Sequence, residues 1–243
     1  MEIFNADCLE KMKELDEDSI DLIFCDLPYG QTSCKWDCKI DLDEFWKQVM
    51  RIKKLHTPIF FTTTTKFGVD LITSAPKKCY FRYDLVWVKS SPAGFLSAKK
   101  MPMRKHEMIY VFYEKLPLYD LSSHKHKFIK EESKELDEKY KNKGGLYSKV
   151  SRNGLLKNES HYNPPLPTTM LEIKSTRGKH STEKPVALME WIFKYYSKEG
   201  DTILDPTMGS GSTGVACKNM NRKFIGIEKD EDIFKMAQSR LND

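Results

Sequence analysis

The sequence has no long hydrophobic run. No window of the 243 residues approaches the roughly 20 consecutive apolar residues that a membrane-spanning helix needs. The first residues, MEIFNADCLEKMKELDEDS, also lack the basic start and the apolar core of a secretory signal. We therefore expect a cytoplasmic protein.

Cysteine is also scarce. Six Cys in a chain of this length do not make the disulfide framework of a small secreted domain, so reduced thiols are expected. Cys34 and Cys38 form one C-x3-C pair, but no second Cys or His pair at ligand spacing lies nearby, and structural zinc usually takes four protein ligands. The pattern favours ordinary loop cysteines and no metal site.

Positive charge is concentrated in the middle of the chain. Residues 89–184 hold 20 Lys or Arg against 11 Asp or Glu, a balance of +9, whereas the whole chain carries +5. Such a split indicates that the middle region meets a polyanion. A solvated lysine-rich surface is the alternative explanation.

Short apolar runs alternate with helical patterns, which is typical of an α/β fold with helices on both faces of a sheet. Residues 41–54 repeat apolar positions at helical spacing, and Thr182 and Pro185 are expected to open a second helix as its cap and its first-turn proline. The expected strands are 19–25, 57–64, 83–89, 108–113, 202–205 and 223–228.

Residues from about 115 to 170 break this rhythm. They hold a charge-rich run followed by loops marked by Gly, Asn and Pro, and they lie in the basic half of the chain. We expect an inserted small region at 115–175. The sheet then divides into two halves of one domain, residues 1–114 and 176–243.

A glycine-rich turn lies near the end of the chain. Gly209, Gly211 and Gly214 form G-x-G-x-x-G between an expected strand and helix, and Glu228 ends the next strand, where an acid can take ribose hydroxyls. The pattern indicates a site for a nucleoside cofactor, although a tight strand-to-helix turn has the same spacing. Because the turn comes late, strand order and chain order should be permuted.

The acid that precedes this turn selects among cofactors. Repulsion between the Asp205 carboxylate and the pyrophosphate of a dinucleotide would cost several kcal/mol, at an effective dielectric of about 20 and a separation of about 4 Å. NAD is therefore disfavoured. S-adenosylmethionine has no phosphate and carries an α-ammonium that Asp205 can pair with, while Glu228 holds the ribose.

A second acid follows another expected strand. Asp26 comes directly after SIDLIFC, as Asp205 ends TILD, and ligands of open α/β sheets bind beyond the carboxyl ends of the strands. If the two strands are neighbours, both acids line one crevice. Taken alone, the segment Asp-Leu-Pro-Tyr-Gly is more typical of a plain turn.

Four segments together resemble the amino-methyltransferases that modify exocyclic amines of DNA bases. Asp26-Leu27-Pro28-Tyr29 resembles the family's D-P-P-Y motif, and DPTMGSGSTG (205–214) resembles its D-P-F-x-G-S-G-T-T loop. HSTEKP (180–185) resembles its H-P-T-x-K-P helix entry, and Asn5-Ala6-Asp7-Cys8 resembles the G-D-C segment before the catalytic strand. Leu27, Ser181 and Met208 depart from the pattern without removing a charged group.

The resemblance implies a Rossmann-like, doubly wound mixed sheet of the class I methyltransferase type in circularly permuted order. It also implies a catalytic group made of Asp26, Leu27, Pro28 and Tyr29, and a possible homodimer. The cofactor S-adenosylmethionine would be contacted by Asp7, Asp26, His180, Thr182, Lys184, Asp205, Pro206, Met208, Gly209, Ser210, Gly211 and Glu228.

A chemical role follows for the catalytic group. The Asp26 carboxylate and the Leu27 carbonyl would accept the two N–H bonds of the target amine, and Pro28 would restrict the loop. Tyr29 would stack on a base flipped out of double-stranded DNA. Phosphate contacts are expected from Lys99, Lys100, Arg104, Lys105 and Arg152, and base readout from Arg152, Asn153, Asn158, His161 and Tyr162.

Adenine N6 is the expected target, because an acidic first motif residue leans toward adenine in the resembled family. Methylation of cytosine N4 is the alternative within the same chemistry, since the same two acceptors suit either amine. A catalytically silent nucleic-acid-binding module and an RNA methyltransferase are further alternatives. The three acids Asp26, Asp205 and Glu228 argue against a silent module, which would have little need of them.

Overall fold

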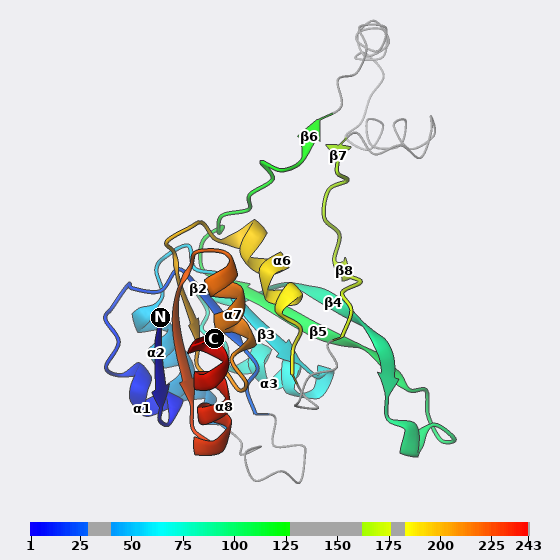
Figure 1. The fold of residues 1–243 in the computed structure, drawn as a ribbon, viewed down its shortest axis with the longest axis horizontal. Coiled ribbons are helices and arrows are strands. Elements are labelled where there is room, and N and C mark those ends of the chain that lie inside the picture. The colour runs from blue at the N-terminus through cyan, green and yellow to red at the C-terminus, as the bar shows by residue number, and fades with distance from the viewer. Residues whose placement is uncertain (29–39, 127–161, 176–182, 243) are drawn as a thin grey trace, which may run out of the picture. The chain divides into compact units, whose positions relative to one another are not determined.

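The computed structural model describes residues 1–28, 40–126, 162–175 and 183–242, and these form two compact units. The first unit comprises residues 1–119 and 169–243, and the second comprises residues 120–168. The second unit falls inside the segment 115–175, which the sequence marks as an insertion. Figure 1 shows the ribbon of both units.

An eight-stranded mixed sheet forms the centre of the first unit, in the order β1-β10-β9-β2-β3-β5-β4-β8 (Figure 1). The last long strands of the chain, β9 and β10, therefore lie between β1 and β2, as the late glycine turn predicts. The strands are β1 (Glu2–Asn5), β2 (Leu22–Cys25), β3 (Ile59–Thr63), β4 (Tyr80–Ala93), β5 (Arg104–Tyr113), β8 (Met170–Leu171), β9 (Thr202–Asp205) and β10 (Lys223–Glu228).

The directions of the strands determine which strand ends lie at the same edge of the sheet. The neighbours from β1 to β3 are all parallel, β5 is antiparallel to both β3 and β4, and β4 therefore runs in the same direction as β3. The resemblance implies a mixed sheet, and the antiparallel strand β5 makes it one. A buried antiparallel strand shows the same run of apolar residues, because both of its faces are covered.

Helices cover both faces of the sheet, with α6, α7 and α8 on one side and α1, α2 and α3 on the other (Figure 1). Helix α2 matches the expected pattern, and the Asp41 carboxylate caps it by accepting the backbone N–H of Asp43 and of Glu44. The helices are α1 (Cys8–Met12), α2 (Leu42–Ile52), α3 (Thr65–Ser74), α6 (Val186–Tyr196), α7 (Ser212–Asn219) and α8 (Glu231–Asn242).

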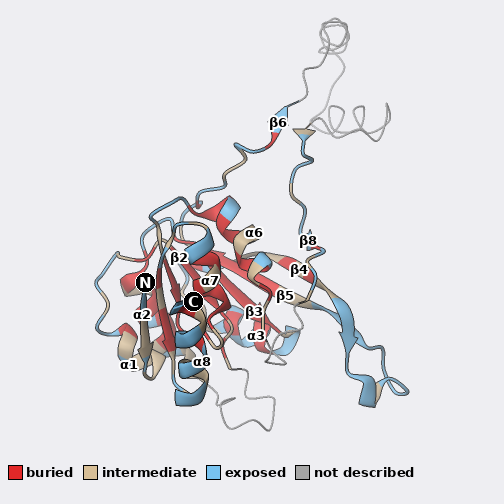
Figure 2. Ribbon diagram, viewed as in Figure 1, coloured by how far each residue is buried: buried red, intermediate tan, exposed pale blue. Residues whose placement is uncertain are grey.

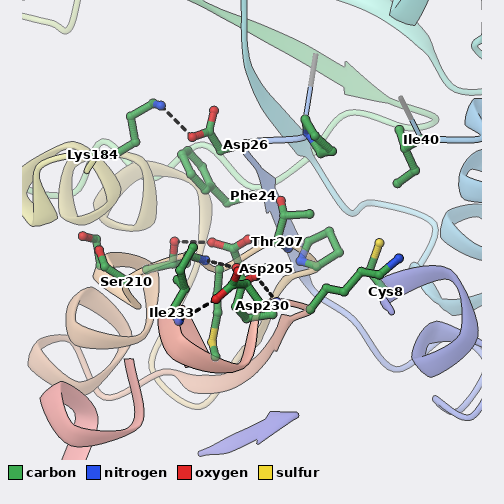
Figure 3. Close-up of a pocket in the computed structure, with 18 of the residues that line it drawn as sticks. Cys8, Phe24, Asp26, Ile40, Lys184, Asp205, Thr207, Ser210, Asp230 and Ile233 are labelled. Atoms are coloured by element: carbon green, nitrogen blue, oxygen red, sulfur yellow. Dashed lines mark hydrogen bonds and ion pairs between the residues drawn. The ribbon is translucent and has the colours of Figure 1, made fainter. Parts of the chain in front are cut away.

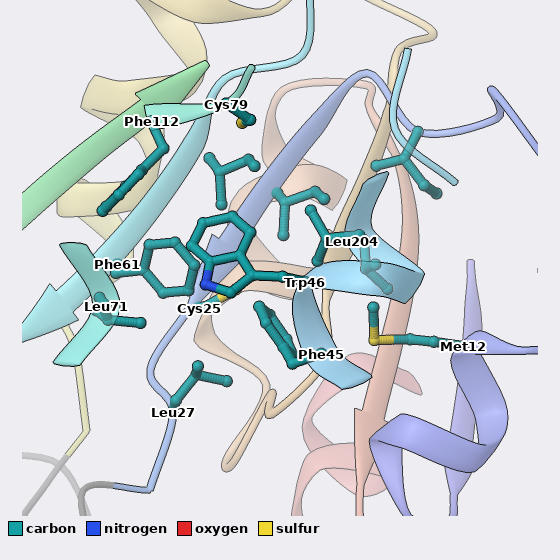
Figure 4. Packing of buried hydrophobic residues seen from close by; sticks show 14 of the residues in the cluster. Met12, Cys25, Leu27, Phe45, Trp46, Phe61, Leu71, Cys79, Phe112 and Leu204 are labelled. Atoms are coloured by element: carbon teal, nitrogen blue, oxygen red, sulfur yellow. The ribbon is translucent and has the colours of Figure 1, made fainter. Parts of the chain in front are cut away.

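An aromatic cluster lies under α2 (Figure 4). The Trp46 ring packs edge-on against Phe61 at 5.5 Å between centroids, and it is tilted against Phe112 at 5.3 Å. Its indole N–H donates to Ser74 Oγ at 3.1 Å, so its one polar atom is satisfied. The Leu27 side chain belongs to the same cluster and is only 2% exposed, which anchors the chain as it leaves β2.

The start of α6 differs from expectation. The helix begins at Val186, and Pro185 occupies the N-cap position with an extended backbone and no capping side chain. Proline is compatible with either position, since it lacks the N–H that the first turn leaves unpaired. Thr182, which we expected as the cap, lies outside the described residues.

In the second unit, β6 (Lys125–His126) and β7 (Tyr162–Asn163) form a short antiparallel pair. The His126 and Tyr162 rings meet edge-on at 5.0 Å, and His124 Nδ1 lies 2.9 Å from the Pro164 carbonyl oxygen. Of the residues expected to read bases, only Tyr162 is described. Arg152, Asn153, Asn158 and His161 lie outside the described residues.

The four cysteines within the described ranges, Cys8, Cys25, Cys79 and Cys217, are free thiols. Cys34 and Cys38 lie outside these ranges. No group of three or more possible metal ligands occurs among the described residues. In the same part of the chain, no helix has the length and apolar character to cross a membrane.

Candidate active site

Two carboxylates meet at the carboxyl edge of the sheet. Strands β2 and β9 are parallel neighbours, with Leu22 opposite Ile203 and Ile23 opposite Leu204. Asp26 follows β2 directly and Asp205 is the last residue of β9. The structure therefore brings these two acids to the same edge, as the sequence predicts.

Both acids line one cavity of about 520 Å³, a size typical of small-molecule sites (Figure 3). Several further expected site residues line the same cavity. They are Asp7, Pro28, Lys184, Pro206, Met208, Gly209, Ser210 and Glu228. Segments from both ends of the chain thus build one site.

Asp26 is held by two side chains. The Thr62 hydroxyl, near the end of β3, donates a hydrogen bond to Oδ1, and Lys184 Nζ lies 2.6 Å from Oδ2. The sequence assigned Lys184 to the cofactor, and the structure places it on the Asp26 carboxylate as well as at the cavity wall. Figure 3 shows this pair on the opposite side of Phe24 from Asp205.

The ion pair continues into a short chain of charges. Lys184 Nζ also lies 3.1 Å from Glu107 Oε1, and the other oxygen of Glu107 lies 2.6 Å from Lys89 Nζ. Burial alone would lower the pKa of Lys184, but the nearby Asp26 and Glu107 carboxylates outweigh it and raise that pKa above its usual range. Lys184 is therefore a fixed cation beside Asp26.

The glycine turn connects β9 to α7. Gly211 occupies the N-cap position of α7 with φ of 79°, a left-handed conformation that costs other residues free energy. The backbone N–H of Gly209 donates to Glu228 Oε2 at 3.1 Å, and the backbone N–H of Asp230 donates to Oε1 at 2.8 Å. The acid at the end of β10 is thereby held against the turn.

Asp205 also binds the glycine turn and the first residues of α7, through both of its carboxylate oxygens. Its Oδ2 accepts the Thr213 hydroxyl at 2.5 Å, and its Oδ1 accepts the Thr207 backbone N–H at 3.1 Å. Burial raises the pKa of Asp205 to about 7 in spite of these hydrogen bonds, and the negative charges of Asp26 and Glu228 add to the rise. Burial likewise raises the pKa of Glu228.

This concentration of acids determines which ligands fit. A phosphate would add negative charge to a cavity that already holds Asp205 and Glu228, whereas a cation would stabilise both carboxylates. The Thr207 hydroxyl oxygen is the only buried side-chain N or O atom without a hydrogen-bond partner among the described residues, and Thr207 lines the cavity. The cavity thus offers a ligand one unused hydroxyl as well as the acids.

The sequence did not single out several of these residues. Thr62 and Glu107 hold the Asp26–Lys184 pair from β3 and β5, and no local motif marks them. Thr207 stands inside the glycine turn, where its position alone was a usable signal. The apolar walls, Phe24 and Ile233, follow only from the arrangement of β2 and α8 (Figure 3).

Some expected residues lie elsewhere. Lys99, Lys100, Arg104 and Lys105 are exposed on the extension of β4 and β5 and do not line the cavity. The Leu27 side chain faces the core, so this residue can offer the site only its backbone. Tyr29, Arg152, His180 and Thr182 lie outside the described residues.

Comparison with known proteins gives relatives over the whole chain. The type II methyltransferase M2.LlaDCHI of Lactococcus lactis subsp. cremoris is 26% identical over 263 aligned residues, which cover 99% of this chain and 88% of the relative. The crystal structure of the M1.HpyAVI–SAM complex is 24% identical with a TM-score of 0.64, and the match covers 99% of each chain.

A further solved structure shares the fold at lower identity. The PvuII DNA methyltransferase, described as cytosine-N4-specific, has a TM-score of 0.69 and 15% identity, with 99% of this chain and 86% of the other covered. The sequence profile of a family described as DNA methylase, of the N6 and N4 type, matches residues 20–239. Because this match spans most of the chain, the protein belongs to the N6/N4 DNA methylase family.

Proposed function

We propose that this protein transfers a methyl group from S-adenosylmethionine to the exocyclic N6 of adenine in DNA. The observation that carries the proposal is the position of Asp26. This acid stands at the end of β2, beside the cavity that Asp205 and Glu228 line, and it is held there by Thr62 and Lys184. An acceptor for an amine thus lies at the rim of a site suited to a cationic nucleoside.

S-adenosylmethionine fits the donor set of the cavity, because it has no phosphate and carries two positive centres. Glu228 would accept ribose hydroxyls, and Asp205 would pair with the α-ammonium. The unpartnered Thr207 hydroxyl supplies a further hydrogen bond. Asp7, which caps α1 by accepting the Leu9 N–H at 3.0 Å, lines the side of the cavity that we assign to the adenine.

When bound, S-adenosylmethionine supplies an electrophilic methyl group on a sulfonium. An exocyclic amine conjugated to a purine ring is a poor nucleophile, because its lone pair is delocalised. The Asp26 carboxylate and the Leu27 carbonyl would accept its two N–H bonds and draw the nitrogen toward tetrahedral geometry. Packing of the Leu27 side chain into the core fixes where that carbonyl points, and Pro28 restricts the backbone after it.

The target base would leave the duplex to reach Asp26, because a base paired inside a duplex cannot bring its exocyclic amine to a carboxylate that lines a cavity. Tyr29 is proposed as the ring on which the flipped base stacks. His180 and Thr182 are proposed to complete the cofactor site, and the second unit, within 115–175, is proposed as the target-recognition region. Arg152 and the exposed lysines of the middle region would contact phosphates.

The proposal is tested by incubating the protein with methyl-labelled S-adenosylmethionine and unmethylated genomic DNA, followed by digestion and identification of the labelled nucleoside. We expect N6-methyladenine. Label on N4 of cytosine would overturn the choice of base while keeping the mechanism. Label on C5 of cytosine, or no label in DNA, would overturn the proposal.

The role of Asp26 is tested in the same assay. Asp26→Ala should lower the transfer rate roughly 100-fold or more, since a positioned acid or base contributes about that much. Cofactor affinity, measured by calorimetry, should change little. Glu10→Ala removes an exposed carboxylate on α1 and serves as the control. Near-normal transfer by Asp26→Ala would contradict the assignment.

A further inference from the structure

A two-stranded arm projects from the sheet where β4 and β5 continue beyond their neighbours (Figure 1). In register, Cys25 at the end of β2 lies level with Phe61, Tyr110 and then Asp84 on β4. Beyond Trp87, which still pairs with β8, strand β4 continues over residues 88–93, which span roughly 20 Å at about 3.3 Å per residue. The arm is therefore a long ribbon rather than a tight hairpin.

The direction of the arm places it beside the active site. Because β4 runs parallel to β2 and β9, its carboxyl end emerges from the same edge of the sheet as Asp26 and Asp205. Glu107 and Lys89 pair across the base of the arm at 2.6 Å, and Glu107 contacts Lys184, the partner of Asp26. The arm thus begins at the catalytic group and extends outward.

The tip of the arm is apolar and uncovered. Phe95 is 81% exposed and Leu96 is fully exposed, and Met101 and Met103 are also exposed (Figure 2 shows the arm in the exposed colour). Surface patches of this kind mark interaction sites in proteins. Two exposed neighbours of this size on a projecting tip need a partner to cover them.

The tip is nevertheless an ordered structure. Phe95–Ser97 form the 3-10 helix η1, which Gly94 starts with φ of 92°. The backbone N–H groups of Ser97 and Ala98 donate to Gly94 and Phe95 at 3.0 Å, and that of Met101 donates to Ser97 at 3.0 Å. These hydrogen bonds define the backbone that carries the apolar side chains.

The charge of the arm identifies the partner. Residues 89–105 contain five basic side chains and no Asp or Glu. Four of these, Lys99, Lys100, Arg104 and Lys105, are exposed around the apolar tip. A positive surface around exposed apolar groups is complementary to the phosphates that flank stacked bases, and a second copy of the arm would repel it.

We propose that this arm binds duplex DNA and that Phe95 and Leu96 insert against the base stack next to the target base, an inference that rests on the function proposed above. A two-stranded ribbon fits a groove of the duplex, and Phe, Leu and Met are side chains that minor-groove proteins insert as wedges between base steps. The arm occupies the space that unstacking opens, while its basic residues hold the flanking phosphates.

The test compares Phe95→Ser/Leu96→Ser with the wild-type protein on duplex DNA and on the same DNA after heat denaturation. We expect the double variant to lose at least tenfold in affinity for the duplex and in methyl transfer to it. Binding to single strands should change less than twofold, since an unpaired strand has no duplex step that a wedge must hold open. Calorimetric affinity for S-adenosylmethionine should stay unchanged.

Leu116→Ser is the matched control. Leu116 is 75% exposed but follows the carboxyl end of β5, at the opposite edge of the sheet, so its replacement should alter neither substrate. If the double variant lost affinity equally for duplex and single-stranded DNA, or lost none, the proposal that Phe95 and Leu96 act as a wedge would be overturned. A change in sedimentation from dimer to monomer in Phe95→Ser/Leu96→Ser would instead identify the tip as a contact between copies.

The binding readout separates this inference from the proposed function. If the wild-type protein methylates neither DNA, the proposed function fails, yet a tenfold loss of duplex affinity in Phe95→Ser/Leu96→Ser still supports the arm as a DNA contact. If the wild-type protein methylates DNA and the variant equals it on both substrates, only the inference about the arm fails.

Discussion

The position of the Asp26 carboxylate is fixed by residues that lie far from it in the chain. Its partner Lys184 is 158 positions away, and Glu107, on β5, holds Lys184 from the other side. A lysine between two carboxylates stays in place only while both remain charged. The geometry of Asp26, the proposed amine acceptor, therefore depends on Glu107, which does not line the cavity.

We expect Glu107→Gln to slow methyl transfer about 10- to 100-fold, because a hydrogen bond to a charged group is worth roughly 1.5–3 kcal/mol. The loss should appear in kcat, with the affinity for S-adenosylmethionine unchanged, since Glu107 lies outside the cavity lining. Single-turnover kinetics with labelled cofactor measure both quantities.

Glu114→Gln provides the matched control for Glu107. Glu114 pairs with Lys53 at 2.8 Å, immediately after β5 and away from the cavity. This variant should leave the transfer rate intact. A rate for Glu107→Gln that equals the rate for Glu114→Gln would show that Lys184 does not need its second carboxylate.

Asp205 gives the protein a dependence on pH. Its pKa in the fold is raised to about 7, above the ordinary value of 3.8, so the folded protein holds this proton more tightly than the unfolded chain. The associated stability is present below about pH 4 and is lost as the pH rises through about 7. The free energy of unfolding without cofactor should therefore fall between pH 5 and pH 8.

Asp205→Asn should remove most of this decrease in the free energy of unfolding. The part removed should be about 1 kcal/mol or more, since one pKa unit corresponds to about 1.4 kcal/mol. Urea unfolding of both proteins at pH 5 and pH 8 measures the difference. Added S-adenosylmethionine should stabilise the wild-type protein more at pH 8 than at pH 6, because its ammonium favours the ionised acid. An identical pH slope in wild type and variant would contradict the assignment.

Some properties of these acids could be predicted from the sequence and others could not. Asp26, Asp205 and Glu228 each end a strand, so their nearness followed from the topology of an α/β sheet. The raised pKa of Asp205 depends on burial by α7 and the turn, which no short motif records. Glu107 gave no signal at all, because its function comes from a contact across the sheet.

At the scale of elements, the close packing of β10 against the turn after β9 shapes the proposed cofactor cavity. Gly226 on β10 lies opposite Asp205, and a Cβ at Gly226 would stand 2.4 Å from the Met208 sulfur and 2.6 Å from the Phe224 ring. Met208 lines the cavity, so the absence of a side chain at Gly226 leaves room for it. Strand β10, which lies between β1 and β9, thereby helps to set the position of the cavity wall.

Gly226→Ala should lower the free energy of unfolding by about 1–3 kcal/mol, the usual cost of an overpacked core, and weaken S-adenosylmethionine binding as Met208 moves. Denaturant titration and calorimetry measure the two effects. Gly200→Ala serves as the control: Gly200 has φ of 82° and open space around it. This control should lose about 1–2 kcal/mol without a change in affinity. Unchanged cofactor affinity in Gly226→Ala would separate Met208 from the site.

Elements were predicted best where an apolar run was buried on both faces. Strands β9 and β10 occur at their expected residues, and α2 agrees within a few residues. The arm was not expected, because residues 90–93 are exposed and polar or small, and only pairing with β5 makes them a strand. Strand β1 was missed for a similar reason, since its pairing with β10 joins opposite ends of the chain.

At the scale of the whole molecule, the cavity that we propose for the cofactor belongs to one unit. Every residue that lines it comes from residues 1–119 or 169–243. Neither cofactor binding nor the hold on Asp26 then requires the second unit, residues 120–168. We propose that the second unit selects the DNA sequence that is methylated.

We therefore expect that replacing residues 120–168 by a flexible Gly/Ser linker preserves S-adenosylmethionine affinity within about twofold, a free-energy change well below the 1.4 kcal/mol of a tenfold effect. Site-specific methylation of duplex DNA should fall at least 100-fold. Calorimetry and sequencing of methylated sites measure the two outcomes. A linker variant that keeps the wild-type pattern of methylated sites would show that target choice resides elsewhere.

The strand order has a consequence for synthesis on the ribosome. Strand β1 pairs only with β10 among the described strands, and β2 has β9 as one of its two neighbours, so both await segments made roughly 180 residues or more later. A nascent chain that stops before residue 202 has a split sheet with two unpaired edges. The incomplete sheet should therefore depend on chaperones until residues 202–228, with β9 and β10, have emerged, and only then can both carboxylates enter the same cavity.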